Sequence, residues 1–212
     1  VFREEIIRGD IAIQDGIIAG IGSFHGKEER DLAGRYVCPG FIDSHLHLES
    51  TLVTPAELVT AASRHGTTTF IVDPHESANV SGLAGIDYIL DQTEDVKANV
   101  YVMMPSCVPA TAIDDNGCTL TAEDMVPYLH NSRILGLGEV MDSISVVQGE
   151  KSMHDKLELF EGRIRDGHAP FLEEGDLQAY AMAGIATDHE CSFFDYAMRE
   201  RRNGLTILVR EG

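Results

Sequence analysis

Short apolar runs alternate with amphipathic stretches along most of the chain, and this alternation predicts strands and helices in turn. Helix candidates include residues 55–65, where Pro55 follows Thr54, and residues 173–183, which end at Gly184. Seven apolar runs are expected to form strands: residues 36–42, 67–72, 99–104, 134–140, 164–167, 185–187 and 205–209.

Roughly thirty residues separate successive strands, which suits one βα unit each. Seven such units predict an α/β fold of the TIM type, a (β/α)8 barrel, that is incomplete here. Residues 36–212 would form this barrel, truncated before strand eight. A doubly wound open sheet is the competing architecture, although no Gly-x-Gly-x-x-Gly follows the first strand.

Residues 4–22 form a different pattern, a β-hairpin that turns at Asp15-Gly16. A lone hairpin is only marginally stable in water, so it needs further strands to pack against. We therefore expect residues 1–35 to be a fragment of a small N-terminal β domain of the β-sandwich type.

The charge and composition of the chain limit the kinds of partner and the setting to be expected. The 212 residues carry a formal net charge of −19, which repels nucleic acid and anionic membranes. No run of about 18 apolar residues predicts a membrane span. The four cysteines contain no Cys-x-x-Cys pair and favour a reducing, cytoplasmic setting.

The candidate chemistry lies at the carboxyl ends of the predicted strands, where βα barrels place their active sites. His45 and His47 are two residues apart on an extended segment, so both imidazoles face one side and can reach one metal ion. The other strand ends supply further histidines and carboxylates: Asp73, His75, Glu76, Glu139, His168, Asp188, His189 and Glu190.

Four of these histidines with one carboxylate can hold two divalent ions about 3.5–4 Å apart. Glu139 is the candidate for the bridging carboxylate, because Gly136 and Gly138 beside it permit close backbone approach. Imidazole and carboxylate ligands suit Zn²⁺, Mn²⁺ and Fe²⁺ alike.

The segment 39–47, Pro-Gly-Phe-Ile-Asp-Ser-His-Leu-His, resembles the strand-one signature of the amidohydrolase superfamily of metal-dependent hydrolases. Later motifs resemble the adenine deaminase family in order and spacing, over nearly the whole chain. They are residues 66–69 with 73–76, 105–110, 138–141, 166–170 and 187–191.

This resemblance implies that His45 and His47 bind one metal, that His168 and His189 bind the other, and that Glu139 bridges them. Many superfamily members bridge with a carbamylated lysine, but no lysine lies at a predicted strand end. The implied metals are Mn²⁺ or Fe²⁺ rather than Zn²⁺, and the implied assembly is a homo-oligomer.

The implied reaction is hydrolytic deamination of the small-molecule purine adenine to hypoxanthine and ammonia by a metal-bound hydroxide. The superfamily's usual proton shuttle is an aspartate after strand eight, which this chain does not contain, so the chain alone is expected to be inactive. Glu190 is the candidate catalytic carboxylate, contacting the purine or sharing proton transfer, or else a salt-bridged residue at the rim.

Family likeness suggests that Asp73, His75 and Glu76 have roles on the substrate side or behind the ligands, although His75 could be a satisfied histidine near a helix start. Ser106 is expected to shape a loop or hydrogen-bond the substrate rather than to act as a nucleophile. Asp188 is expected to orient a histidine ligand.

Two other functions compete with deamination: an amide-cleaving, deacetylase-like amidohydrolase, and an inactive truncated fragment. The deaminases that act on bases in nucleic acid are excluded because half of their sequence motif is missing. His47-Leu48-Glu49 matches half of their motif, but the Pro-Cys-x-x-Cys half is absent.

Overall fold

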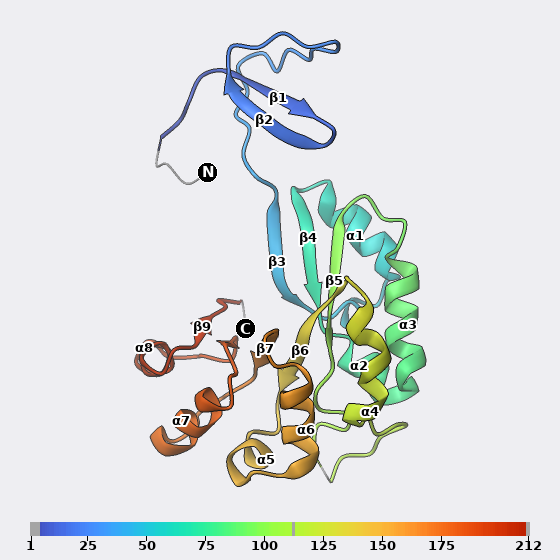
Figure 1. The fold of residues 1–212 in the computed structure, drawn as a ribbon, viewed down its shortest axis with the longest axis vertical. Coiled ribbons are helices and arrows are strands. Elements are labelled where there is room, and N and C mark those ends of the chain that lie inside the picture. Colours follow the sequence, from blue (N-terminus) through green and yellow to red (C-terminus); the bar gives the residue numbers. More distant parts are fainter. Residues whose placement is uncertain (1–4, 112, 211–212) are drawn as a thin grey trace. The chain divides into compact units, whose positions relative to one another are not determined.

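The computed structural model describes residues 5–111 and 113–210. The chain divides into two compact units, Val1–Pro39 and Gly40–Gly212. Figure 1 shows the ribbon of both units.

The first unit contains the predicted hairpin, with strands β1 (Asp10–Gln14) and β2 (Ile17–Gly22) paired antiparallel. Asp15 and Gly16 both have positive φ, 52° and 78°. That pair of values is the requirement of the tight hairpin turn that suits strand twist. The hairpin prediction is confirmed, and its first predicted residue, at position 4, lies outside the described residues.

The second unit is built on a curled, fully parallel five-stranded sheet in the order β3-β4-β5-β6-β7. Sequential order without a reversal is typical of a barrel, whereas a doubly wound sheet changes direction at a switch point. The structure is therefore an incomplete TIM-type barrel. The strands are β3 (Phe41–Leu46), β4 (Thr67–Val72), β5 (Asn99–Met104), β6 (Ile134–Val140) and β7 (Ile164–Gly167).

Two short strands, β8 (Thr187–Asp188) and β9 (Thr206–Ile207), form a separate parallel pair after this sheet. One backbone hydrogen bond links this region to β7, from Ala186 N to Arg165 O at 2.9 Å. The chain thus continues around the barrel in the predicted order, although β8 and β9 are shorter than the predicted runs.

The first barrel strand differs most from prediction, since it covers residues 41–46 rather than 36–42. Pro39 lacks a backbone N–H for a ladder bond. Gly40 packs so tightly on Thr68 that an added Cβ would lie 2.8 Å from the Thr68 Cβ. The strand begins after this pair, which puts His45 inside the strand and His47 just beyond it.

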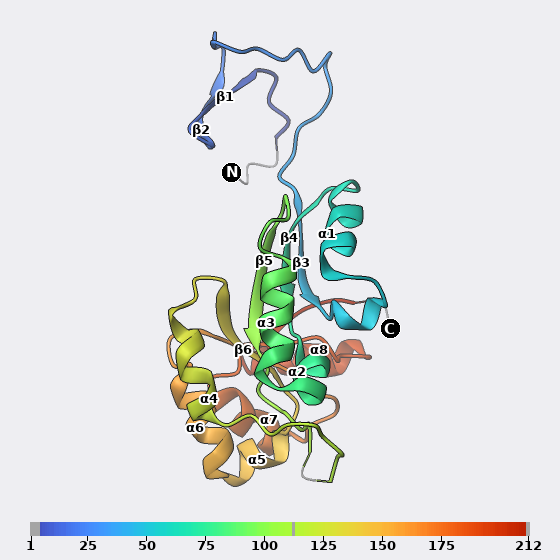
Figure 2. The ribbon, with the colours of Figure 1, turned by 90° about the vertical axis from the view of Figure 1, so that its right-hand side faces the viewer.

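Helices follow the strands and cover one side of the sheet; α1 and α3 lie on the same side, as the two views in Figures 1 and 2 show. The two helix predictions are confirmed to within two residues at each end. The helices are α1 (Pro55–Ser63), α2 (His75–Ser81), α3 (Leu83–Gln92), α4 (Ala122–Met125), α5 (Ser143–Gln148), α6 (Lys151–Leu159), α7 (Glu174–Met182) and α8 (Phe194–Arg202), with 3-10 turns at Glu49–Thr51 and Val126–His130.

The hydrophobic core of this unit contains both strand and helix side chains. Val102 and Leu137 from the strands and Ile86 and Ile89 from α3 are fully or almost fully buried. Burying each such side chain stabilises the fold by about 1.5–3 kcal/mol. This layer anchors the strands whose ends carry the polar site. No helix in the described part of the chain is long and apolar enough to cross a membrane.

Candidate metal centre

His45, in β3, and His47, just after it, are each held at Nδ1 by one hydrogen-bond acceptor. The Nδ1 of His45 lies 3.1 Å from Asp166 Oδ2, and the Nδ1 of His47 lies 2.8 Å from the backbone carbonyl of Asp73. A carbonyl and a carboxylate can only accept, so both Nδ1 atoms donate. The two Nε2 atoms therefore face away from these acceptors, and they lie 3.2 Å apart.

Glu139, at the end of β6, lies at the centre of four imidazoles and is only 3% exposed. Its Oε1 is 2.8 Å from Nε2 of His45, 2.8 Å from Nε2 of His47 and 3.6 Å from Nε2 of His189. Its Oε2 is 3.1 Å from Nδ1 of His168. One carboxylate thus joins the histidine pair of β3 to the two histidines that follow β7 and β8.

The electrostatics of this cluster require positive charge. Burial by itself lowers the pKa of His45, but hydrogen bonds to Asp166 and Glu139 outweigh it and raise the pKa to about 10. Burial is likewise outweighed at His47, chiefly by Glu139, and the pKa rises to about 9. Burial opposes the ionisation of Glu139, yet hydrogen bonds from His168 and then His45 and His47 hold its pKa far below the ordinary value.

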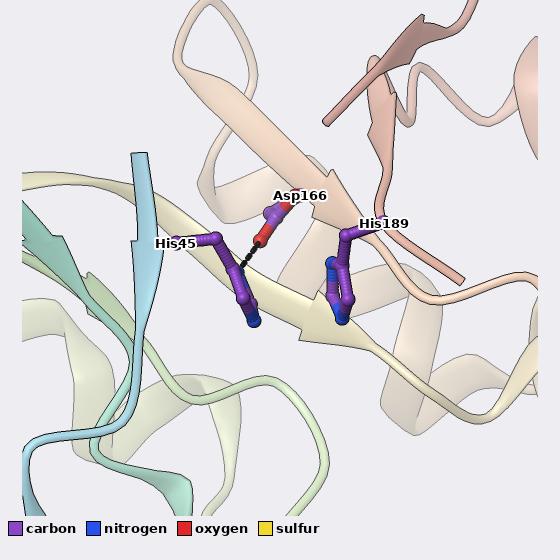
Figure 3. A group of neighbouring side chains, drawn as sticks. All are labelled: His45, Asp166 and His189. Atoms are coloured by element: carbon purple, nitrogen blue, oxygen red, sulfur yellow. Dashed lines mark hydrogen bonds and ion pairs between the residues drawn. The ribbon is translucent and has the colours of Figure 1, made fainter. Parts of the chain in front are cut away.

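The surroundings of His189 indicate that a bound cation supplies this positive charge. It is 4% exposed, and neither ring nitrogen has a hydrogen-bond partner among the described residues. Its ring stacks on that of His45 at a centroid distance of 3.7 Å, and Figure 3 shows the two rings facing each other beside Asp166. Buried polar atoms are normally partnered. Unpartnered imidazole nitrogens beside a buried carboxylate fit a bound cation.

The potential ligand atoms fall into two sets that share Glu139. His45, His47 and Glu139 form one, and Glu139, His168 and His189 form the other, with all ligand atoms of a set within 4.8 Å of one another. Nitrogen and carboxylate oxygen donors in such a shared arrangement suit two divalent cations. Two further sets are equally compact and share a residue with these two. One joins His45, Asp166 and His189, and the other joins Asp73, His75 and Glu139.

The backbone of Glu139 is held on both sides. Its N–H donates to Asp73 Oδ2 at 2.7 Å, and its carbonyl accepts from the hydroxyl of Ser106. Gly138 leaves the room for this contact, because a Cβ there would lie 2.7 Å from Asp73 Cγ. Asp73 and Ser106 thus act on the peptide groups around Glu139.

His75 and Glu76, two further predicted site residues, differ in how closely they approach the histidine cluster. The ring of His75 packs edge-on to that of His47, 4.5 Å between centroids, and its Nδ1 is 3.8 Å from Asp73 Oδ1. Glu76 is exposed and accepts a hydrogen bond from Ser50 at 2.7 Å, so it faces the 3-10 turn Glu49–Thr51.

Asp188 acts on backbone rather than on an imidazole. Its two oxygens accept from the N–H groups of Ala169 and Glu190, at 2.7 and 2.8 Å. These residues directly follow His168 and His189. Asp188 therefore ties the two histidine-bearing segments to each other.

Glu190 faces both the cluster and the rim. Its Oε1 is 3.6 Å from Nε2 of His189, 3.9 Å from Nδ1 of His168 and 3.1 Å from Nη1 of Arg210. Both interpretations of this residue, proton transfer and a salt-bridged rim, fit these contacts.

Sequence reasoning missed Asp166 and Tyr180. Asp166 lies two residues before His168 on an extended segment, and this spacing puts both side chains on one face, a usable signal. The hydroxyl of Tyr180 accepts from His168 N at 2.9 Å and donates to Val140 O at 2.6 Å. Nothing in the sequence of α7 indicates this role.

Comparison with known proteins gives a family match and several similar proteins. The model of the amidohydrolase family matches residues 36–208. The chain is 59% identical over 212 residues to an adenine deaminase of Desulfitobacterium hafniense and 48% identical over 214 residues to one of Clostridium acetobutylicum, in each case across all of this chain. An adenine deaminase of Methanoculleus marisnigri is 46% identical over 203 residues, 96% of this chain. The chain spans 37%, 38% and 39% of the lengths of these relatives.

Proposed function

The chain belongs to the amidohydrolase family, and on that premise we propose that the full-length protein hydrolyses adenine to hypoxanthine and ammonia at the centre around Glu139. The observation that carries the proposal is the single buried carboxylate with four imidazole nitrogens 2.8–3.6 Å from its oxygens. The proposed purine substrate is inferred from the relatives, which are adenine deaminases.

Membership of the family implies a divalent metal cofactor. We propose two ions, one held by His45 and His47 and the other by His168 and His189, with Glu139 between them. Bound there, such ions would lower the pKa of a water toward neutrality and so supply a nucleophile. The likeness to adenine deaminases favours Mn²⁺ or Fe²⁺ over Zn²⁺.

Neighbouring residues orient the histidine ligands, and burial shields Glu139 and His189 from water. Asp166 and the Asp73 carbonyl keep Nε2 of His45 and of His47 turned toward Glu139. Second-layer partners of this kind fix imidazole tautomer and ring orientation. Burial of the carboxylate and of His189 keeps solvent from saturating these groups.

Glu190 lies beside His168 and His189, 3.9 and 3.6 Å from their ring nitrogens, whereas Glu139 lies between the histidines. In the proposed reaction water adds to C6 of adenine and the exocyclic amine leaves as ammonia, so that amine must gain a proton. A carboxylate beside the site can hold and deliver it. We propose that Glu190 shares in this transfer, while Arg210, whose Nη1 lies 3.1 Å from Oε1 of Glu190, holds the carboxylate in place.

The test is hydrolysis by the full-length protein loaded with Mn²⁺, measuring hypoxanthine and ammonia from adenine. Glu139→Gln should abolish both metal retention and product formation, while Glu158→Gln, an exposed change on α6, should alter neither. Acyl release from N-acyl substrates without deamination of adenine would instead assign an amide hydrolase. A homo-oligomeric assembly and a cytoplasmic setting stay predictions; four cysteines without a disulfide agree with the latter.

A further inference from the structure

A buried lysine lies behind the metal centre. Lys156, on α6, is 7% exposed, and no carboxylate of the described residues forms an ion pair with it. Burying an ammonium group without a counter-charge costs several kcal/mol. Burial accordingly lowers the pKa of Lys156. Such a position calls for a contact that offsets the cost.

The contact is with the peptide of Ser106. Lys156 Nζ donates to the Ser106 carbonyl at 2.7 Å. Ser106 is 1% exposed, and its own hydroxyl donates to the carbonyl of Glu139. A chain of two hydrogen bonds therefore runs from the ammonium group to the backbone of the carboxylate at the centre of the cluster.

We propose that Lys156 is a positioning residue: by holding the Ser106 peptide, it keeps the Ser106 hydroxyl on the Glu139 carbonyl and so aims the Glu139 carboxylate at the four histidines. This inference rests on the proposed metal centre. Asp73 holds the N–H of Glu139 at 2.7 Å, and the lysine chain completes the restraint on the carbonyl side. A charged donor makes a hydrogen bond stronger than a neutral one, which explains an ammonium group at this position.

The surroundings allow the lysine to be tested by substitution. A cavity of about 470 Å³ is lined by Ser106, Cys107, Asp142 and Lys156, by the loop before α4 and by further residues of α4 to α6. A methionine at 156 keeps the length of the stem and has this space beside it. Lys151 is on the same helix, and its side chain is 86% exposed and pairs with Asp155 at 2.6 Å, so Lys151→Met is a matched control.

The experiment compares Lys156→Met, Lys151→Met and the parent full-length protein, using Mn²⁺ affinity and the visible absorption spectrum of the Co²⁺-loaded protein. Loss of a group that orients metal ligands typically costs 10–100-fold in affinity. We expect about a ten-fold loss of Mn²⁺ affinity and an altered Co²⁺ spectrum for Lys156→Met, and parent-like values for Lys151→Met.

Ser106→Ala removes the second bond of the chain and leaves the Ser106 carbonyl in place. It should weaken Mn²⁺ binding to a similar degree, and the double variant should lose little more than either single one. Parent-like affinity and spectrum in Lys156→Met overturn the inference, whatever happens to folding stability. If Lys156→Met does not fold, parent-like affinity in Ser106→Ala overturns it.

These readouts separate the inference from the proposed reaction. A parent protein that binds Mn²⁺ but does not deaminate adenine overturns the substrate and leaves the role of Lys156 open to the same affinity measurement. A parent protein that deaminates adenine, together with a Lys156→Met variant whose Co²⁺ spectrum and Mn²⁺ affinity are unchanged, supports the proposed reaction and overturns the role of Lys156.

Discussion

Adding a single methyl group at Gly138 should disable the metal centre without touching any ligand. A Cβ there would lie 2.7 Å from Asp73 Cγ and closer still to Oδ2. Carbon atoms in contact prefer about 3.5–4.0 Å, so the Asp73 carboxylate must move by about 1 Å. The bond from Glu139 N to Asp73 Oδ2, 2.7 Å long, would then exceed the normal hydrogen-bond range.

Two costs add up in Gly138→Ala. Overpacking a buried site costs about 1–3 kcal/mol, and leaving the buried N–H of Glu139 unpaired costs about 1–3 kcal/mol. We therefore expect the free energy of unfolding to fall by about 2–6 kcal/mol. A shift of about 1 Å at a positioned group can cost about 100-fold in rate, so the proposed deamination, measured with Mn²⁺ added to the full-length protein, should fall by about that factor.

Gly175→Ala is the matched control, because it makes the same change in α7 where an added Cβ meets nothing within 4 Å. Helix propensity predicts that it stabilises the protein by up to about 1 kcal/mol. Urea unfolding and Mn²⁺ titration of both variants supply the comparison. If Gly138→Ala matched Gly175→Ala in both, the restraint of Glu139 by Asp73 would be refuted.

Three further changes have defined outcomes. Asp166→Asn removes the charge behind His45 and should weaken Mn²⁺ binding by about ten-fold in calorimetric titration; unchanged affinity would contradict its orienting role. Tyr180→Phe leaves the partly buried N–H of His168 without its acceptor and the buried Val140 carbonyl without its donor, and urea unfolding should show a loss of about 1–3 kcal/mol. Burial raises the pKa of Glu200 to about 7, so the stability contributed by its protonated carboxyl is present below its ordinary pKa and is lost as pH rises through 7. Glu200→Gln should therefore gain stability relative to the parent at about pH 9 and not at about pH 5, and an equal gain at both would reject the shift.

Much of the barrel was readable from local pattern. The bounds of β4 to β7 agree with the predicted runs. β5 and β6 are largely apolar, whereas β7 is the short Ile-Arg-Asp-Gly segment, which lies directly before the His168 motif. The first strand was misplaced because the apolar run before Pro39 has the composition of a strand but cannot continue through the proline into the ladder.

The site residues were readable for a related reason. Parallel strands present their carboxyl ends at one edge, so polar residues that close successive strands are expected to meet. Glu139 and the histidines at 45, 47, 168 and 189 follow this rule, and the structure brings them within a few ångströms of one another.

What supports those residues was decided only by the tertiary structure. Asp166 reaches His45 across 121 positions of sequence, and Lys156 reaches Ser106 across 50. Lys156 shares the buried face of α6 with Met153 and Leu157, a position where the sequence pattern alone predicts an exposed charge. The strand order and the ligand types could be predicted from the sequence alone, because successive βα units pack in chain order and the residues that close the strands are read directly. Only the curl of the sheet determined which acceptor holds which imidazole, because those contacts join side chains from strands and helices far apart along the chain.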